Sequence, residues 1–170
     1  MVSVEVCVAF TGFPTTSRGF YSMFKLFSHS PINRNFGLLV IRLGVGLSVI
    51  VFHGYDKLVG GPDMWAGLGA SMGNLGLGFA PVFWGFMAMF AEFIGSILIV
   101  LGVLFRPALL MLGFTMFTAV VTHLNMPAES PAAGWGGASH AIELLCVYAG
   151  LYLTGPGKYA FSLMKKPDEY

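Results

Sequence analysis

"PVFWGFMAMFAEFIGSILIVLGVLF", residues 81–105, decides the fold of this chain, because it is long enough to cross a membrane and carries one charged residue, Glu92. A helix needs about 20 mainly apolar residues to span a bilayer. The rest of the chain agrees: of its 170 residues 56% are hydrophobic and 10% are charged, and mean hydropathy is +0.76. A soluble domain carries about 25% charged residues. The sequence therefore predicts an integral membrane protein.

Three further apolar stretches approach the length of a span: residues 36–52, 107–124 and 139–154. Together with residues 81–105 they predict an all-α integral membrane protein with a four-transmembrane-helix bundle over residues 36–155. Residues 1–35 are expected to form an N-terminal cytoplasmic or interfacial segment, in which either Met1 or Met23 can be the start. Residues 156–170 are expected to form a cytoplasmic C-terminal tail.

The first outer loop, residues 59–80, has a pattern of its own. Trp65, Leu68, Met72 and Leu75 recur at helical spacing, which predicts a short interfacial helix in this loop. Such a helix can simply cover the end of the bundle, or it can act as a gate for a substrate, and the sequence does not separate these two roles.

Basic residues predict the orientation of the bundle. With four spans, one side of the membrane collects Arg18, Lys25, Arg34, Arg106, Lys158, Lys165 and Lys166, while the other side holds Lys57 alone. Short loops rich in Lys and Arg stay in the cytoplasm. Both termini of this multi-pass membrane protein are therefore expected in the cytoplasm.

Charged residues inside the spans predict a functional site, because ionised side chains in the bilayer are costly and usually face the bundle interior. Arg42 lies in the first span and Glu92 in the second. Arg42 and His53 are 11 residues apart, which on a helix is three turns plus about 20°, and Lys57 is about 40° further round. These three side chains share one face. An Arg42–Glu92 pair is geometrically possible, either as a structural ion pair or as part of a site.

Polar residues from all four spans gather at the outer level of the predicted bundle. A lone His at a helix end is ordinary, but a collection contributed by four spans predicts a polar site there. His140 and Glu143 are three residues apart, so they share one face of their helix. The candidate catalytic residues are Glu92, His123 and His53, and the candidate substrate-binding residues are Arg42, Lys57, His140 and Glu143.

Several classes of chemistry lack their usual residues. The two cysteines, Cys7 and Cys146, form no CxxC pair, and there is no His-x-x-His or Glu-x-x-His pair, so no metal site is predicted. No haem or nucleotide motif is present, and no basic stripe suggests nucleic acid. His, Lys and Glu can serve the carbonyl oxygens of a quinone and relay protons, so a quinone is one candidate cofactor, while the residues alone leave the chemistry open.

Five features together resemble the DoxX family over residues 36–162: "RLGVG" (42–46), "HGYDKL" (53–58), "AEFIGSILIVLGVLFRPA" (91–108), a His at 123 that closes the third span, and "LTGPGKYAFS" (153–162). The resemblance implies a small, multi-pass four-helix protein of the bacterial or archaeal cytoplasmic membrane. The family takes its name from a subunit associated with a terminal quinol oxidase, and related DoxD proteins act in thiosulfate:quinone oxidoreductase. The positions that match the family pattern are Arg42, His53, Lys57, Glu92, Arg106, His123 and Glu143.

The predicted function is therefore that of a membrane subunit linked to quinone-dependent redox chemistry, an oxidoreductase with a polar site in the outer half of the bundle. Two alternatives stay open: a non-catalytic accessory subunit of a larger respiratory or photosynthetic electron-transfer complex, and a small-solute transporter. Whether the chain is an enzyme by itself also stays open. The expected partners are the lipid bilayer, other membrane redox subunits and further copies of the chain.

Overall fold

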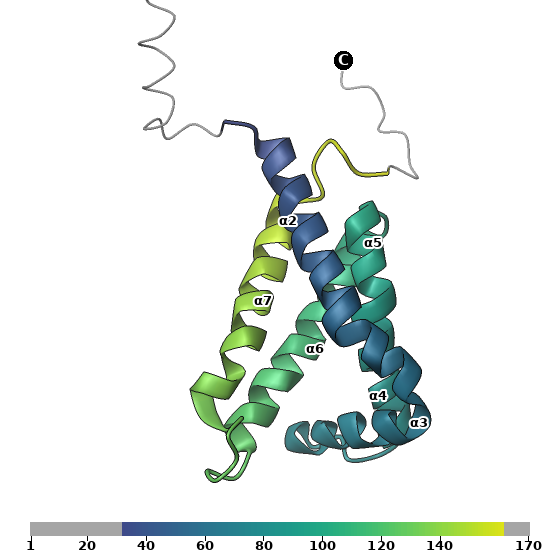
Figure 1. The fold of residues 1–170 in the computed structure, drawn as a ribbon, viewed down its shortest axis with the longest axis vertical. Helices are drawn as coiled ribbons and strands as arrows, with labels where there is room; N and C mark the ends of the chain where they lie inside the picture. The colour runs from purple at the N-terminus through teal and green to yellow at the C-terminus, as the bar shows by residue number, and fades with distance from the viewer. Residues whose placement is uncertain (1–31, 162–170) are drawn as a thin grey trace, which may run out of the picture. The chain divides into compact units, whose positions relative to one another are not determined.

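The computed structural model describes residues 32–161, and within this range the chain forms helices and no strand. The chain descends through one long helix, climbs through a second, descends through a third and climbs through a fourth (Figure 1). The expectations for residues 1–31 and for residues 162–170 lie outside the described part. The elements are α2 (Arg34–Val49), η1 (Ile50–Gly54), α3 (Tyr55–Ala70), η2 (Ser71–Leu75), α4 (Pro81–Phe90), η3 (Ala91–Gly95), α5 (Ser96–Leu101), α6 (Phe105–Asn125) and α7 (Gly134–Thr154).

Three helical stretches are long and apolar enough to cross a membrane. They are Arg34–Leu75, Pro81–Leu101 and Phe105–Asn125. The prediction of an all-helical membrane protein is thus confirmed for the described residues. Helix α7 has 21 residues, as many as α6, but it is not among these three stretches.

The helix boundaries differ from the expected ones at several points. The first helix does not end at Phe52 but continues to a kink at Gly61, whose φ of 65° and ψ of −164° are not helical, followed by Pro62. Proline has no N–H to continue a helix, so it fits the first turn of a new one. Helix α5 ends at Leu101 because Gly102 adopts a left-handed conformation with φ 78°. Helix α7 begins at Gly134 and not at Ser139, so His140 lies inside the helix and not at its start.

The half of α3 that follows the kink turns across the end of the bundle and continues into η2 (Figure 1). It packs on α4 backbone to backbone: a Cβ atom added at Gly69 would lie 1.8 Å from the Pro81 carbonyl oxygen, and one at Gly85 would lie 1.9 Å from that of Trp65. The Trp65 indole N–H donates to the Lys57 carbonyl oxygen (2.7 Å) across the kink. This helix therefore covers the end of α4.

Two π-helical segments, η1 and η3, face each other in the middle of the bundle. A Cβ atom added at Gly54 in η1 would lie 2.9 Å from the Cα atom of Phe93 in η3. A π-helical segment holds one extra residue per turn, which changes the direction of the side chains that follow, and such segments are frequent at functional sites. Here η3 contains Glu92, and η1 contains His53 and precedes Lys57.

Candidate functional site

The centre of the candidate site is an ion pair between the Lys57 ammonium and the Glu92 carboxylate. Lys57 lies on α3 before the kink, and Glu92 lies on η3. The Glu92 side chain is only 3% exposed and that of Lys57 is 17% exposed. A charge at this depth must be paired, because removing an isolated ion from water costs several kcal/mol. The pair therefore allows two ionised groups to stay inside an apolar bundle.

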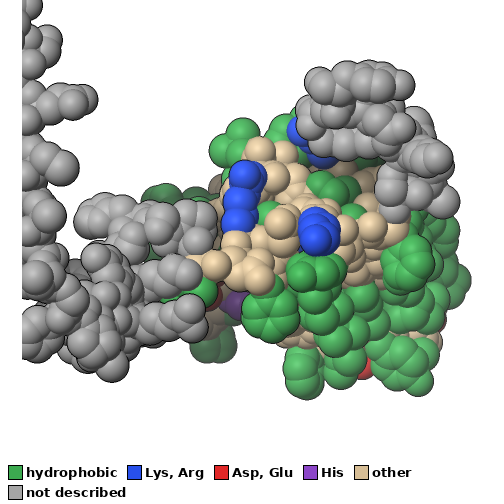
Figure 2. All heavy atoms as spheres, turned by 90° about the horizontal axis from the view of Figure 1, so that it is seen from above, with side chains coloured by type: hydrophobic (Ala, Val, Ile, Leu, Met, Phe, Trp, Pro, Cys, Tyr) green, Lys and Arg blue, Asp and Glu red, His purple; other side chains and the backbone are tan. Residues whose placement is uncertain are grey.

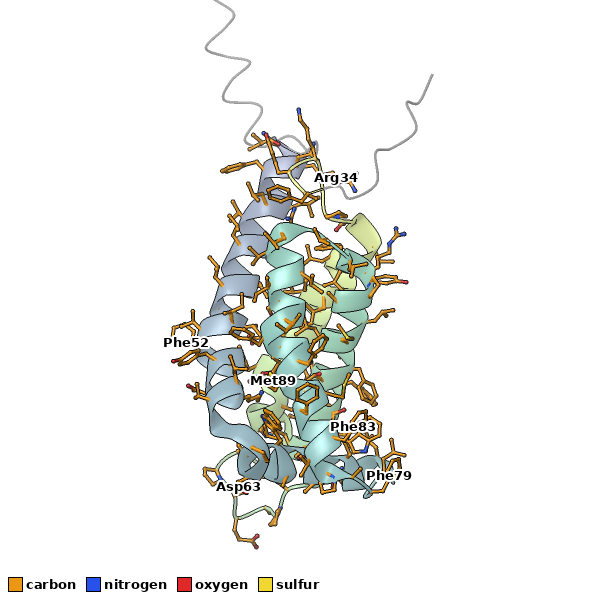
Figure 3. All side chains as sticks on the ribbon, turned by 90° about the vertical axis from the view of Figure 1, so that its right-hand side faces the viewer. Arg34, Phe52, Asp63, Phe79, Phe83 and Met89 are labelled. Carbon is orange, nitrogen blue, oxygen red and sulfur yellow. The ribbon has the colours of Figure 1, made fainter. Side chains whose placement is uncertain are left out.

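A cavity of about 480 Å³ adjoins this pair. It lies between α3, η2, α4, η3 and α6, and the half of α3 after the kink forms part of its wall. Phe83 lies on the wall that α4 contributes to the cavity and is labelled in Figure 3. In the same view Met89 points into the bundle and Phe52 points away from it. Apart from Lys57, Glu92 and His123, the lining consists of small, apolar, aromatic and hydroxyl side chains: Leu68, Gly69, Ser71, Met72, Phe83, Trp84, Met87, Ala88, Ala91, Met111, Phe114, Thr115, Thr118, Ala119, Thr122 and Met126.

His123 lines the same cavity from the last turn of α6. Its Nδ1 atom lies 2.7 Å from the carbonyl oxygen of Ala132. Because a carbonyl oxygen only accepts hydrogen bonds, this contact places a proton on Nδ1 and leaves Nε2 as the second functional atom of the ring. The hydroxyl groups of Thr115, Thr118 and Thr122 donate to backbone carbonyls one turn earlier in α6. The cavity thus has few side chains whose donors are not already in use.

His53 and His140 form a second feature next to the ion pair, outside the cavity lining. Their rings stack with centroids 5.4 Å apart and planes inclined by 26°. His53 is half-buried and feels the charges of both Glu92 and Lys57, whereas His140 is exposed. The two imidazoles therefore form a series of titratable rings that starts beside the buried carboxylate and ends at the surface.

Arg42 lies away from this cavity and is held by backbone. It is fully buried, with 0% exposure. Its Nε donates to the Ile99 carbonyl oxygen (2.9 Å), its Nη2 to that of Val100 (2.7 Å) and its Nη1 to that of Pro156 (2.7 Å). No Arg42–Glu92 pair forms, because Glu92 pairs with Lys57 and the Arg42 donors face the end of α5.

The last two predicted positions also lie apart from the cavity. Glu143 is on an exposed face of α7 and is not part of the cavity lining. Arg106, a position implied by the family resemblance, is exposed at the start of α6, with its guanidinium carbon 5.9 Å from the centre of the Tyr152 ring. The structure thus brings Lys57, Glu92 and His123 together at the cavity and places the other predicted residues elsewhere.

Sequence reasoning missed two polar groups near the site. The Tyr148 hydroxyl and the Trp84 indole nitrogen are buried, and neither has a hydrogen-bond partner among the described residues. Tyr148 is 2% exposed and close enough to Glu92 to feel its charge. Both belong to apolar helices in which aromatic residues are common, so nothing in the sequence pattern separates them from exposed aromatic residues. A useful indication would have been that buried Tyr and Trp usually require a polar partner.

The comparisons with known proteins agree with the motifs. The family model described as DoxX matches residues 37–125, a range that contains Arg42, Lys57, Glu92 and His123. No curated protein and no solved structure matches the chain. The family match covers more than half of the chain, and the chain therefore belongs to the DoxX family.

Proposed function

We propose that this protein binds a quinone in the cavity beside the Lys57–Glu92 pair and takes part in its oxidation and reduction. The observation that carries the proposal is the position of that pair, which provides a cation and a carboxylate on the wall of a mainly apolar cavity. Ligand sites typically combine an apolar lining with a few polar groups that orient the ligand. A quinone has the matching chemistry: a flat apolar ring with carbonyl oxygens at two opposite ends.

Each polar group of the cavity has a role in this proposal. The Lys57 ammonium donates to one carbonyl oxygen of the ring. At the other end of the ring the Nε2 atom of His123, which carries no proton while Nδ1 donates to Ala132, accepts a hydrogen bond from the hydroxyl group of the quinol. Methionine side chains are flexible and polarisable, so Met87 and Met111 suit a flat conjugated ring. The same apolar lining disfavours transport of a hydrophilic solute, which needs polar groups along its path. The role as an accessory subunit stays a prediction that co-purification of a partner would test.

Protons are the second requirement, because the oxygen atoms of the ring take up protons when a quinone is reduced to a quinol. Lys57, Glu92 and His123 are the acid–base side chains that line the cavity. The stacked rings of His53 and His140 offer a route for protons between Glu92 and the surface. The electrons come from a redox partner or cofactor of another protein, so this chain supplies the binding site and the protons.

The proposal includes the placement of the protein in the membrane. We take α7 as a fourth span, since it equals α6 in length and buries Ala141, Leu144 and Tyr148 in the bundle. Lys and Arg side chains are visible on the end of the molecule shown in Figure 2. The described basic residues on that side are Arg34, Arg106 and Lys158, and all three are exposed. This distribution of positive charge supports a cytoplasmic position for this end, and with it a position of the cavity in the outer half of the bilayer.

Binding of a short-tailed quinone to the purified full-length protein in detergent tests the proposal. Trp84 lines the cavity, so quenching of tryptophan fluorescence should report saturable binding. Glu92→Gln removes the charged partner of Lys57, the side chain that is proposed to donate to the quinone. Hydrogen bonds to charged groups contribute about 1.5–3 kcal/mol, so we expect the affinity for the quinone to change by about tenfold or more. Ala119→Phe should abolish binding by filling the cavity, while Glu143→Gln, an exposed carboxylate outside it, should leave binding unchanged.

The same experiment can refute the proposal. Quenching that does not saturate, or that is equal in the wild type and in a folded Ala119→Phe variant, would mean that the quinone only partitions into the detergent. A folded state of each variant is verified by its elution as a single symmetric peak in size-exclusion chromatography. In that case the cavity would not be a quinone site.

A further inference from the structure

We propose that the groove between α2 and α7 is a binding site for an anionic phospholipid, with an acyl chain along the two helices and the phosphate group at Arg34 and Lys158. The site is separate from the quinone cavity and does not depend on it. The argument rests on the lining of the groove, on the positive charge at one end of it, and on the orientation of two copies in one membrane.

The groove is apolar and open. It encloses about 500 Å³, with Leu38 and Ile41 on the α2 side and Val147 and Leu151 on the α7 side. Thr154, the lining residue with a hydroxyl group, donates that group to the Gly150 carbonyl oxygen (2.8 Å). The groove therefore offers only hydrocarbon contacts, which suit an acyl chain and do not suit water.

Two lining positions are glycines that leave the groove unfilled. A Cβ atom added at Gly44 or at Gly150 would have no atom within 4 Å, apart from its own helix. Neither glycine is therefore explained by close packing of α2 against α7. The space above them is available to a molecule that lies between the helices.

Positive charge lies at the end of the groove formed by Thr154. The Arg34 Nη2 atom donates to the Thr154 carbonyl oxygen (3.2 Å), which fixes the guanidinium at this end. The backbone N–H of Lys158 donates to the Asn35 side chain (3.0 Å), so Lys158 lies beside the first turn of α2. Both basic residues are exposed. An arginine has five N–H donors, so the contact with Thr154 leaves donors for a phosphate oxygen.

This charge favours a lipid over a second copy of the chain. Two copies in one membrane have the same orientation, so a parallel dimer through this groove would bring the Arg34 and Lys158 ends of both copies together. Like charges repel, whereas an anionic headgroup neutralises them. Basic pockets between transmembrane helices are known to bind the headgroups of anionic lipids, and here the pocket continues into a groove that fits the chain of the same molecule.

Native mass spectrometry of the full-length protein after exchange into phosphatidylglycerol or phosphatidylcholine tests this inference. We expect phosphatidylglycerol to stay bound and phosphatidylcholine to be lost. One basic residue near a membrane surface contributes enough to change the affinity about fivefold, so Arg34→Gln should weaken phosphatidylglycerol binding by about that factor. Gly44→Leu should displace the lipid by filling the groove. The matched controls are Arg106→Gln, a basic residue outside the groove, and Gly37→Leu, an open α2 position outside it; neither should change lipid binding.

Four results would overturn the inference. Equal retention of both lipids, or equal retention in wild type and folded Gly44→Leu, would show that the groove is not selective for an anionic lipid. Displacement of the bound lipid by inorganic phosphate would point to a simple anion site. Conversion of a dimer to a monomer in Gly44→Leu, with lipid binding unchanged, would show that a second copy occupies the groove.

Discussion

Replacement of Arg42 by methionine should destabilise the bundle, because this arginine closes the end of a helix. Helix α5 stops at Gly102, and the last carbonyl groups of a helix have no partner within it. Arg42 donates to two of these, on Ile99 and Val100, and also to the carbonyl of Pro156. Its positive charge also lies at the negative end of the helix dipole. Methionine retains much of the side-chain volume but has no donor.

The expected loss follows from these contacts. Each carbonyl left without a partner in a buried position costs about 1–3 kcal/mol. Arg42→Met leaves the Val100 and Pro156 carbonyls without this donor, whereas the Ile99 carbonyl still accepts from the Gly102 backbone N–H (3.1 Å). We therefore expect the free energy of unfolding to fall by at least about 2 kcal/mol. For a chain of this length that corresponds to a midpoint of thermal unfolding lower by about 4 °C or more.

Thermal unfolding in detergent, followed by the fraction that elutes as a monodisperse species after heating, measures this loss. Arg42→Lys keeps the charge but cannot reach three carbonyls at once, so it should fall between the wild type and Arg42→Met. Arg106→Met is the matched control, since Arg106 is exposed and contacts only the Tyr152 ring among the described interactions of its side chain. If Arg42→Met melts like the wild type but fails to bind the quinone, the arginine belongs to the site and our assignment of a structural role is wrong.

Three more substitutions test the contacts around the cavity. Lys57→Met leaves the Glu92 carboxylate buried without a partner, so it should lower the unfolding free energy by about 3 kcal/mol or more. Adding Glu92→Gln removes the unpaired charge and should recover part of that loss. A double variant no more stable than Lys57→Met would contradict this. Gly85→Val should lower thermal stability because its Cβ has no room against the Trp65 carbonyl, whereas Gly67→Ala, at an open helical position, should not. Trp65→Phe should lower the unfolding free energy by about 1 kcal/mol, the value of one hydrogen bond; an unchanged melting midpoint would show that the kink does not need this bond.

Hydropathy was sufficient to predict the helices, because a span of bilayer length needs a continuous apolar stretch whatever its neighbours are. It was not sufficient to predict where they end. The first helix passes Phe52 and continues to Gly61, since nothing in the polar residues His53, Asp56 and Lys57 prevents helical backbone. The kink requires a residue that tolerates φ near 65°, which only the glycine before Pro62 indicates.

The orientation of side chains could be predicted in part. Ordinary helical spacing places Arg42, His53 and Lys57 on one face, and all three are at least partly buried. The partner of each could not be predicted, because η1 and η3 each add a residue to a turn and so change which side chains meet. Arg42 lies level with Ile99, seven residues beyond Glu92 and so about 10 Å further along the helix, which is why the possible Arg42–Glu92 pair does not form.

The family motifs separate in space into two assemblies, and both assemblies draw residues from the first helical stretch, Arg34–Leu75, and from the second, Pro81–Leu101. At one end, Arg42 from the first motif, the α5 terminus from the third and Pro156 from the last form a cap. At the other end, Lys57 from the second motif and Glu92 from the third meet beside the cavity. Because α4, η3 and α5 form one continuous helix, the cap holds the axial position of Glu92 relative to Lys57. Arg42 can therefore be essential to the cavity without lining it. The effect of its substitution on thermal stability distinguishes this role from that of a residue that contacts a ligand.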